Sequence, residues 1–473
     1  VLTTDPGCVM AYWGIAMTQN HPLWAPPTAT ELKKASAALE KAKSLSVKTQ
    51  RERDYLAAIN AFYADYDKLD HPTRTLAYEK AMEQVFTRYS DDKEAAIFYA
   101  LALLGTASSR PVDKTFSKQK RAVEILNGVL AKQPDHPGIA HYIIHSYDYP
   151  PLASLALPAA LSYAKIAPSS PHALHMPTHI FTRLGLWPES IKSNLASAEA
   201  AKNLVARTHP GSGSFDQLHA MDYLAYAYLQ QSQDEKAKQV LNELKTISKL
   251  DDYVIAAAYS FAAAPARYAV ERRKWSDAAR LPLLPPEFPW NRFPHMEAIN
   301  SFARALGSAR SGDPASARKE TERLEALRKM LIASKDPYWP TQVEIQRLTA
   351  EAWIARAESR NEDALRIMRS AAELEDSTDK HPVTPGSILP ARELLGDMLL
   401  ELERPGEALR EYQASLQTSP NRFGGLYGAA RAAELAGDRT KARELYLKLI
   451  KLCEKADTER PELAHARKFL AGQ

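Results

Sequence analysis

A histidine pair that recurs at a fixed interval constrains the fold of this chain more than any other feature. His141 and His145 are followed by His175 and His179, each 34 residues further on. Within each pair the residues stand at i and i+4, so both imidazoles share one helical face, with Cβ atoms about 5–6 Å apart. The interval therefore predicts repeated units that each contain the same helix.

Thirty-four residues is the period of the tetratricopeptide repeat (TPR), a hairpin of two helices that pack closely at small residues and end at a proline. The clearest match has Leu395-Gly396 in the first helix, Ala408 at the small position of the second, and Pro420 at its end. Only 18 of the 473 residues are glycine, which favours helix throughout. We predict an all-α, TPR-like α-solenoid, a right-handed superhelix of antiparallel helix pairs.

Proline-rich stretches interrupt the array. Residues 281–294 carry five prolines together with Trp290 and Phe293, and residues 376–390 carry several more. We expect both to be ordered connections laid across a face of the solenoid. The predicted organisation is an N-terminal array at 1–280 that holds the histidines, a connection at 281–294, and a C-terminal array at 295–473 that ends in a capping helix.

Composition and motifs exclude several classes of function. Basic and acidic residues nearly balance, at 61 against 57, and no strong basic stripe occurs, so nucleic acid is not an expected partner. No run of 18 apolar residues is present, so no membrane span is expected. Cys8 and Cys453 stand at opposite ends of the chain and form no metal-binding motif. Glycine-rich phosphate loops, nucleophile elbows and HExxH motifs are also absent from the sequence.

The histidines are concentrated in one part of the chain. Eight of the 13 lie between residues 136 and 219. Equivalent helices of a TPR array line up along its concave groove, with neighbouring axes about 8–10 Å apart. We therefore expect His141, His145, His175 and His179 to converge between two adjacent helices.

Three further residues are predicted to join this cluster. Ala237 and Ser190 both fit the small position of a repeat's second helix. When they are aligned, His219 takes the position of His172. Asp222 then takes the position of His175. Imidazoles with a carboxylate form the donor set of Zn, Cu, Ni and Fe sites. The sequence thus predicts a transition-metal site, with Cu or Zn favoured before Fe. Its predicted ligands are His141, His145, His175, His179, His172, His219 and Asp222.

Other interpretations of the histidines stay open. Duplicated histidines can be inherited with the repeat, and they can form a hydrogen-bonding wall for a peptide or an organic ligand.

Pro177 conflicts with a continuous helix through the second pair, because proline removes a backbone donor and clashes with the preceding turn. Either the helix is kinked there, or it begins near Met176.

The residues that carry a resemblance to a known family lie in five stretches, 5–16, 135–145, 171–181, 385–397 and 420–423. On them the chain resembles a bacterial family of TPR-repeat proteins of uncharacterised function with paired HxxxH and HxxHMPxHIF motifs. The resemblance implies an all-helical array that is often exported, which favours a periplasmic or extracellular location over the cytoplasm. It also implies a helix ahead of Val1, so we expect the chain to begin within a repeat. Relatives often carry a glutamate after the position of His145, and Asp148 is the candidate that replaces it here.

The function expected from the sequence is that of a TPR-repeat binding or scaffold protein whose concave groove holds a histidine-rich transition-metal site. One alternative is a metalloenzyme whose histidine-bound ion keeps an open coordination position. Another is a metal-free adaptor that binds a peptide in the groove. The expected partners are accordingly a metal ion and a protein or peptide.

Overall fold

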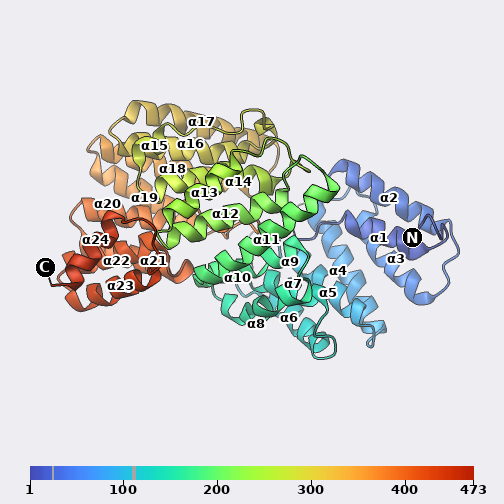
Figure 1. Ribbon diagram of the computed structural model, residues 1–473. Coiled ribbons are helices and arrows are strands. Elements are labelled where there is room, and N and C mark those ends of the chain that lie inside the picture. The colour runs from blue at the N-terminus through green and yellow to red at the C-terminus, as the bar shows by residue number, and fades with distance from the viewer. Residues whose placement is uncertain (24–25, 109–112, 473) are drawn as a thin grey trace. The chain divides into compact units, whose positions relative to one another are not determined.

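The computed structural model describes residues 1–23, 26–108 and 113–472, and within these ranges the chain is helical without a β-strand (Figure 1). The helices form antiparallel hairpins that stack in sequence order, which confirms the predicted all-α solenoid. Two compact units divide the chain, Val1–Tyr147 and Asp148–Gln473. None of the described helices is long and apolar enough to cross a membrane.

Side-chain caps start several helices of the first unit. Thr28 and Thr49 each accept a hydrogen bond from the backbone N–H three residues on, and Glu31 and Glu52 accept one from the cap residue's own N–H. These capping boxes satisfy donors that a helix start leaves unpaired. The helices of this unit are α1 (Val9–Thr18), α2 (Ala29–Lys43), α3 (Gln50–Tyr63), α4 (His71–Arg88), α5 (Lys93–Ala107), α6 (Ser117–Leu130) and α7 (Pro137–Tyr147).

The first half of the second unit contains short helices followed by long ones. A 3-10 turn, η1 (Ala153–Ala156), leads into the first helix, and α12 is buried from Gln217 to its end at Gln230. The helices are α8 (Leu157–Ile166), α9 (Pro171–His175), α10 (Pro177–Leu184), α11 (Trp187–Thr208), α12 (Phe215–Gln230), α13 (Asp234–Leu244), α14 (Ile255–Val270) and α15 (Trp275–Ala279).

The second half of this unit consists of regular hairpins. Small residues such as Ala317, Ala364, Ala408 and Ala442 are buried where paired helices meet, as the repeat pattern predicts. The helices are α16 (Pro294–Arg310), α17 (Pro314–Ala333), α18 (Trp339–Ala357), α19 (Asn361–Asp376), α20 (Ala391–Glu401), α21 (Pro405–Thr418), α22 (Phe423–Leu435), α23 (Arg439–Leu452) and α24 (Pro461–Leu470).

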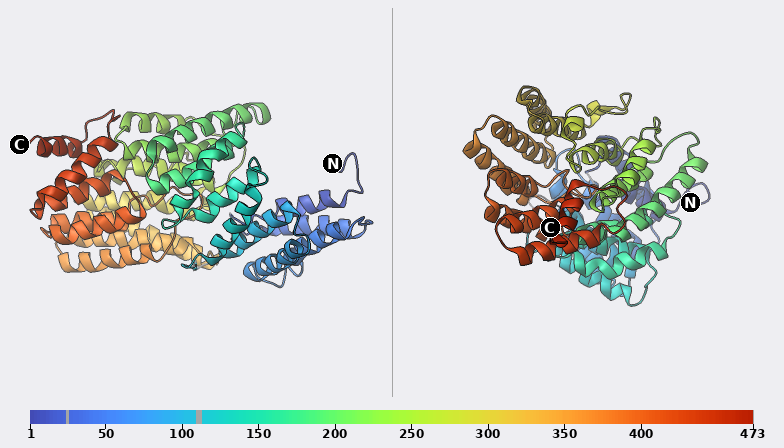
Figure 2. Two further views of the ribbon diagram at one scale, coloured as in Figure 1. Left: turned by 90° about the horizontal axis from the view of Figure 1, so that it is seen from below. Right: turned by 60° about the vertical axis from the view of Figure 1, so that its left-hand side comes forward.

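The two ends of the second unit contact each other (Figure 2). Trp187 donates from its indole N–H to the carbonyl of Asn421, at 2.7 Å. Arg460 Nε donates to Asp234 Oδ2 at 3.1 Å, and both side chains of that pair are buried. The segment α11–α13 is therefore joined to the segment α22–α24, so an early part and the last part of this array are in contact.

The predicted connection at 281–294 lies inside the second unit. It joins α15 to α16 through the 3-10 turn η2 (Trp290–Arg292). Phe288, Trp290 and Phe293 are buried in the same core as the flanking helices. These aromatic contacts hold the connection against the helices that it joins.

A long connection between α19 and α20, the 377–390 segment, is packed against several helices of the second unit. Tyr259 of α14 donates to the Gly386 carbonyl at 3.2 Å, and Arg267 Nη2 donates to the same oxygen at 2.8 Å. Val383 and Ile388 are buried. Lys380 of this segment also donates to Asp148, which lies 232 residues earlier.

Candidate metal centre

The second histidine pair spans a break between two helices. α9 ends at His175, Met176 links the helices, and α10 begins at Pro177, which occupies the first helical position. Proline fits there because the N–H that it lacks would have no intrahelical partner. Of the two predicted outcomes, the helix start near Met176 is therefore the one that forms. His179 lies in the first turn of α10.

His175 and His179 point their Nε2 atoms at each other, 3.2 Å apart. Both side chains are buried, with 2% and 1% of their surface exposed. Each ring holds its other nitrogen, Nδ1, against a hydrogen-bond acceptor. His175 Nδ1 lies 2.8 Å from Asn194 Oδ1, and His179 Nδ1 lies 3.2 Å from Asp148 Oδ2.

These acceptors determine the tautomers of the two rings. Asn194 donates its Nδ2 to the Ser190 carbonyl at 2.8 Å, so its oxygen must be the atom that faces His175. An ionised Asp148 can only accept. Both Nδ1 atoms therefore carry the proton, and both Nε2 atoms present lone pairs to the same point.

A third imidazole completes the cluster from α12. His219 lies with its ring centroid 4.2 Å from that of His175, and one nitrogen from each of His175, His179 and His219 lies within 4.8 Å of the others. His219 Nδ1 is buried and finds no hydrogen-bond partner in the described part of the chain. The Tyr223 ring packs against all three imidazoles, with centroid distances between 4.7 and 5.4 Å.

Burial and mutual repulsion keep these imidazoles neutral. Burial, reinforced by the charges of neighbouring imidazoles, holds the pKa of His175 and of His219 well below the usual value. Burial also lowers the pKa of His179, although its bond to Asp148 acts in the opposite direction. Neutral imidazole is the form that binds a metal ion.

Asp148 provides the carboxylate that contacts the cluster, and it forms ion pairs with two cations. Arg183 Nε donates to its Oδ1 at 2.8 Å, and Lys380 of the 377–390 segment donates to its Oδ2 at 2.6 Å. Burial favours the protonated acid, but the charges of Lys380 and Arg183 outweigh it and hold the pKa of Asp148 well below the usual range. The carboxylate that orients His179 is therefore ionised.

The remaining predicted ligands occupy other environments. Asp222 accepts a hydrogen bond from Arg267 Nη1 at 2.7 Å, and both side chains are fully buried. His172 lies on α9 and is partly buried, and its burial together with the charge of His179 lowers its pKa to about 4. In the first unit, His141 and His145 lie on α7 with their Nε2 atoms 3.1 Å apart.

Sequence reasoning missed two residues that orient the cluster. Asn194 lies on α11 and Lys380 on the 377–390 segment, so neither belongs to the repeat position that pointed to the histidines. Asn194 carries a weak signal, since a polar residue four positions after the small Ser190 faces the same side of its helix. Lys380 carries none, because 232 residues separate it from Asp148.

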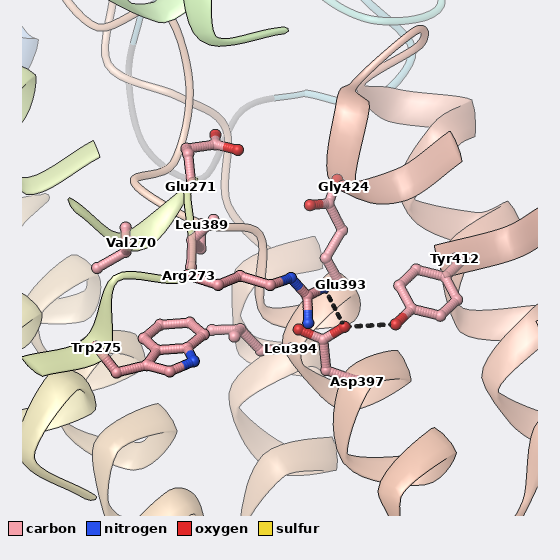
Figure 3. A pocket seen from close by; sticks show the side chains of 10 residues that line it. All are labelled: Val270, Glu271, Arg273, Trp275, Leu389, Glu393, Leu394, Asp397, Tyr412 and Gly424. Atoms are coloured by element: carbon pink, nitrogen blue, oxygen red, sulfur yellow. Dashed lines mark hydrogen bonds and ion pairs between the residues drawn. The ribbon is translucent and has the colours of Figure 1, made fainter. Parts of the chain in front are cut away.

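A separate pocket lies among α14, α15, α20 and α21 (Figure 3). Arg273 Nη2 and the Tyr412 hydroxyl both donate to Asp397 Oδ1, at 2.8 and 2.6 Å. Glu393, which lines the pocket, accepts a hydrogen bond at Oε1 from Arg422 Nε, at 2.7 Å. Since these charges already have partners in the protein, we assign this pocket no ligand.

Comparison with known proteins agrees with the repeat pattern. The tetratricopeptide repeat family model matches residues 219–247 and 425–454. The chain contains tetratricopeptide repeats. The first match covers α12 and α13 and opens on His219, so one histidine of the cluster belongs to a recognised TPR hairpin. No curated protein sequence matches the chain significantly.

Solved TPR-type structures resemble the chain at a distance. A human IFIT1 dimer with m7Gppp-AAAA is 12% identical over 95% of this chain and 95% of its own, with a TM-score of 0.39. The TPR domain of P58(IPK) is 15% identical over 80% of this chain and 99% of its own, with a TM-score of 0.23. The Cut9–Hcn1 hetero-tetramer of APC/C is 12% identical over 100% of this chain and 90% of its own, with a TM-score of 0.31. Likenesses at this level carry no information on function.

Proposed function

We propose that this TPR-repeat scaffold protein binds a transition-metal ion through His175, His179 and His219. One observation carries the proposal. The Nε2 lone pairs of His175 and His179 face each other at 3.2 Å, while Asn194 and Asp148 occupy both Nδ1 atoms. Two facing lone pairs repel unless a cation lies between or beside them.

The nitrogen separation suits one shared ion. Two imidazole nitrogens bound to Zn²⁺ at about 2.0–2.1 Å in tetrahedral geometry lie about 3.3 Å from each other. His175 and His179 already have this spacing, and one nitrogen of His219 lies within 4.8 Å of a nitrogen of each. Asn194 and Asp148 act as the outer partners that fix ring orientation in metal sites.

Ligand chemistry narrows the choice of ion. Three neutral imidazoles favour Zn or Cu over Mn, Mg or Ca, which prefer oxygen donors, and Fe is a further candidate. His172 and the pair His141 and His145 are additional ligand candidates from the repeat pattern. Arg267 engages Oδ1 of Asp222, and the buried Oδ2 has no hydrogen-bond partner in the described part of the chain, so Asp222 also stays a ligand candidate.

The direct test is the metal content of protein purified without a histidine tag, measured by ICP-MS before and after incubation with Zn²⁺ and Cu²⁺. The proposal expects about one equivalent in the parent, as for a single three-histidine site, and its loss in a His175→Ala/His179→Ala variant. His209→Ala is the matched control, because His209 is an exposed histidine of the same unit. Absence of metal from the reconstituted parent would refute the proposal.

A catalytic role is the second candidate. Three histidines leave a coordination position for water or substrate, as in the three-histidine sites of zinc enzymes. The cluster's burial excludes bulk water, which strengthens electrostatic stabilisation of reacting groups. Exchangeable ligand binding at the loaded ion separates this role from a purely structural metal site, which is closed.

Peptide binding is the third candidate, because TPR arrays present extended binding surfaces. In the second unit, the 377–390 segment lies against α14 and contacts Asp148, so a peptide on that face competes with the chain itself. Binding of an extended peptide that survives His175→Ala/His179→Ala would support the adaptor alone.

A further inference from the structure

We infer that the metal ion at His175, His179 and His219 takes a small anion as its fourth ligand, and that the positive charge of Lys380 favours binding of this anion. This inference rests on the proposed function, and it names the class of molecule that the site accepts. Three observations support it: the charge balance around the cluster, the position of Lys380, and the burial of the histidines.

The charge balance leaves the ion unneutralised. Three neutral imidazoles contribute no negative charge. Asp148 is the carboxylate that touches the cluster, and two cations, Arg183 and Lys380, already pair with it. Asp222 is paired with one cation, Arg267, through Oδ1. A divalent ion here adds two positive charges to a group that is already positive, and a buried excess of charge is costly unless an anion offsets it.

Lys380 lies where its charge reaches the proposed site. Its Nζ is 2.6 Å from Asp148 Oδ2, which is itself 3.2 Å from His179 Nδ1. The ammonium group makes one hydrogen bond in the described part of the chain, although it carries three donors.

Burial restricts the size of the anion. His175, His179 and His219 expose 2%, 1% and 8% of their surface, and Lys380 exposes 8% of its side chain. A ligand that reaches side chains buried to this degree must be small. The structure therefore favours a small inorganic anion, such as hydroxide or azide, over a macromolecular ligand.

Azide is a suitable probe, and Cu²⁺ is a suitable ion, since Cu²⁺ binds nitrogen sites more tightly than the other divalent ions of its row. Full-length protein loaded with one equivalent of Cu²⁺ is titrated with azide while the azide-to-copper charge-transfer band is recorded. The parent is expected to show saturable azide binding. Lys380→Met is expected to weaken azide binding about tenfold or more, the order expected for losing one nearby cation in a partly shielded interior.

Two matched variants control for other effects. Lys380→Arg keeps the charge and is expected to bind azide within about threefold of the parent. Lys202→Met removes a partly exposed lysine of the same unit, whose partner is Glu243, and is expected to change nothing. If Lys380→Met fails to fold, as judged by circular dichroism, Lys380→Gln replaces it, because glutamine can still donate to Asp148.

The outcomes separate the two proposals. A parent that takes up no metal contradicts the proposed function itself. A copper-loaded parent that shows no saturable azide band overturns the anion inference and leaves the metal site standing. Equal azide affinity in the parent and in Lys380→Met also overturns it, because the anion then does not depend on the lysine.

Discussion

Two histidine pairs with the same spacing have different surroundings. On α7 of the first unit, His141 and His145 hold their Nε2 atoms 3.1 Å apart, both are partly exposed, and the Tyr142 ring stacks on His141. Across the α9–α10 break of the second unit, His175 and His179 are 3.2 Å apart and buried. The spacing between the nitrogens is almost the same in both pairs.

The difference lies in what fixes each ring. Asn194 and Asp148 assign the proton of both rings in the second pair, which leaves two lone pairs facing each other. The first pair is only half-buried, whereas the second pair is buried and carries assigned hydrogen bonds on its outer nitrogens. Equal spacing therefore occurs in two environments, and burial together with these outer hydrogen bonds makes the second pair the proposed metal site.

The largest effect is expected from removing the second pair. His175→Ala/His179→Ala takes away two of three proposed ligands, so metal affinity should fall by far more than the roughly 10–100-fold that an outer partner contributes. Competition with a chelator of known affinity measures the loss. Retention of metal with near-parent affinity would show that the ion binds elsewhere.

A large effect on stability rather than on metal binding is expected from Asp222→Ala. The change leaves Arg267 buried without its carboxylate, which typically costs roughly 3–5 kcal/mol. Denaturant unfolding followed by circular dichroism gives the free energy of unfolding, and metal content should stay at the parent level. Loss of metal from a folded variant would instead make Asp222 a ligand, as the repeat alignment predicts.

Asp148→Asn tests the outer hydrogen bond that distinguishes the second pair. An amide can offer either its oxygen or its NH₂ group to His179, and it carries no charge, so metal affinity should fall about 10–100-fold. Asp397→Asn provides the control, because Asp397 is a buried, arginine-paired carboxylate that touches no histidine of the cluster. Equal losses in both variants would point to general destabilisation.

The smallest effect is expected from His141→Ala/His145→Ala. If the second pair and His219 hold the ion, removal of the first pair should change metal affinity by less than about tenfold, the scale of an indirect effect. The same chelator competition measures this change. A loss as large as that of His175→Ala/His179→Ala would show that all four histidines share one site.

The repeat spacing predicted much of the architecture because helix periodicity and proline positions are local properties. The 34-residue interval predicted hairpins, and the conflict at Pro177 predicted either a kink or a helix start near Met176, next to the residue at which α10 begins. The alignment of two repeats also brought His219 into consideration, and the structure places it beside His175.

Other parts of the site depend on contacts that no local pattern encodes. Asp222 stands one helical turn from His219, yet its carboxylate is taken by Arg267, which comes 45 residues later. Lys380 reaches Asp148 only because the 377–390 segment folds back onto the start of the second unit. The closure of that unit by Arg460 and Asp234 is equally remote in sequence.

X-ray absorption fine structure at the metal K edge tests the central claim most directly. For protein loaded with one equivalent of Zn²⁺, the account predicts a coordination shell with three imidazole nitrogens at about 2.0–2.1 Å, including the outer-ring scattering typical of histidine. The same measurement on His175→Ala/His179→Ala should show no such shell. A parent spectrum without imidazole scattering, or one unchanged in the variant, would contradict the assignment of His175, His179 and His219 as the metal ligands.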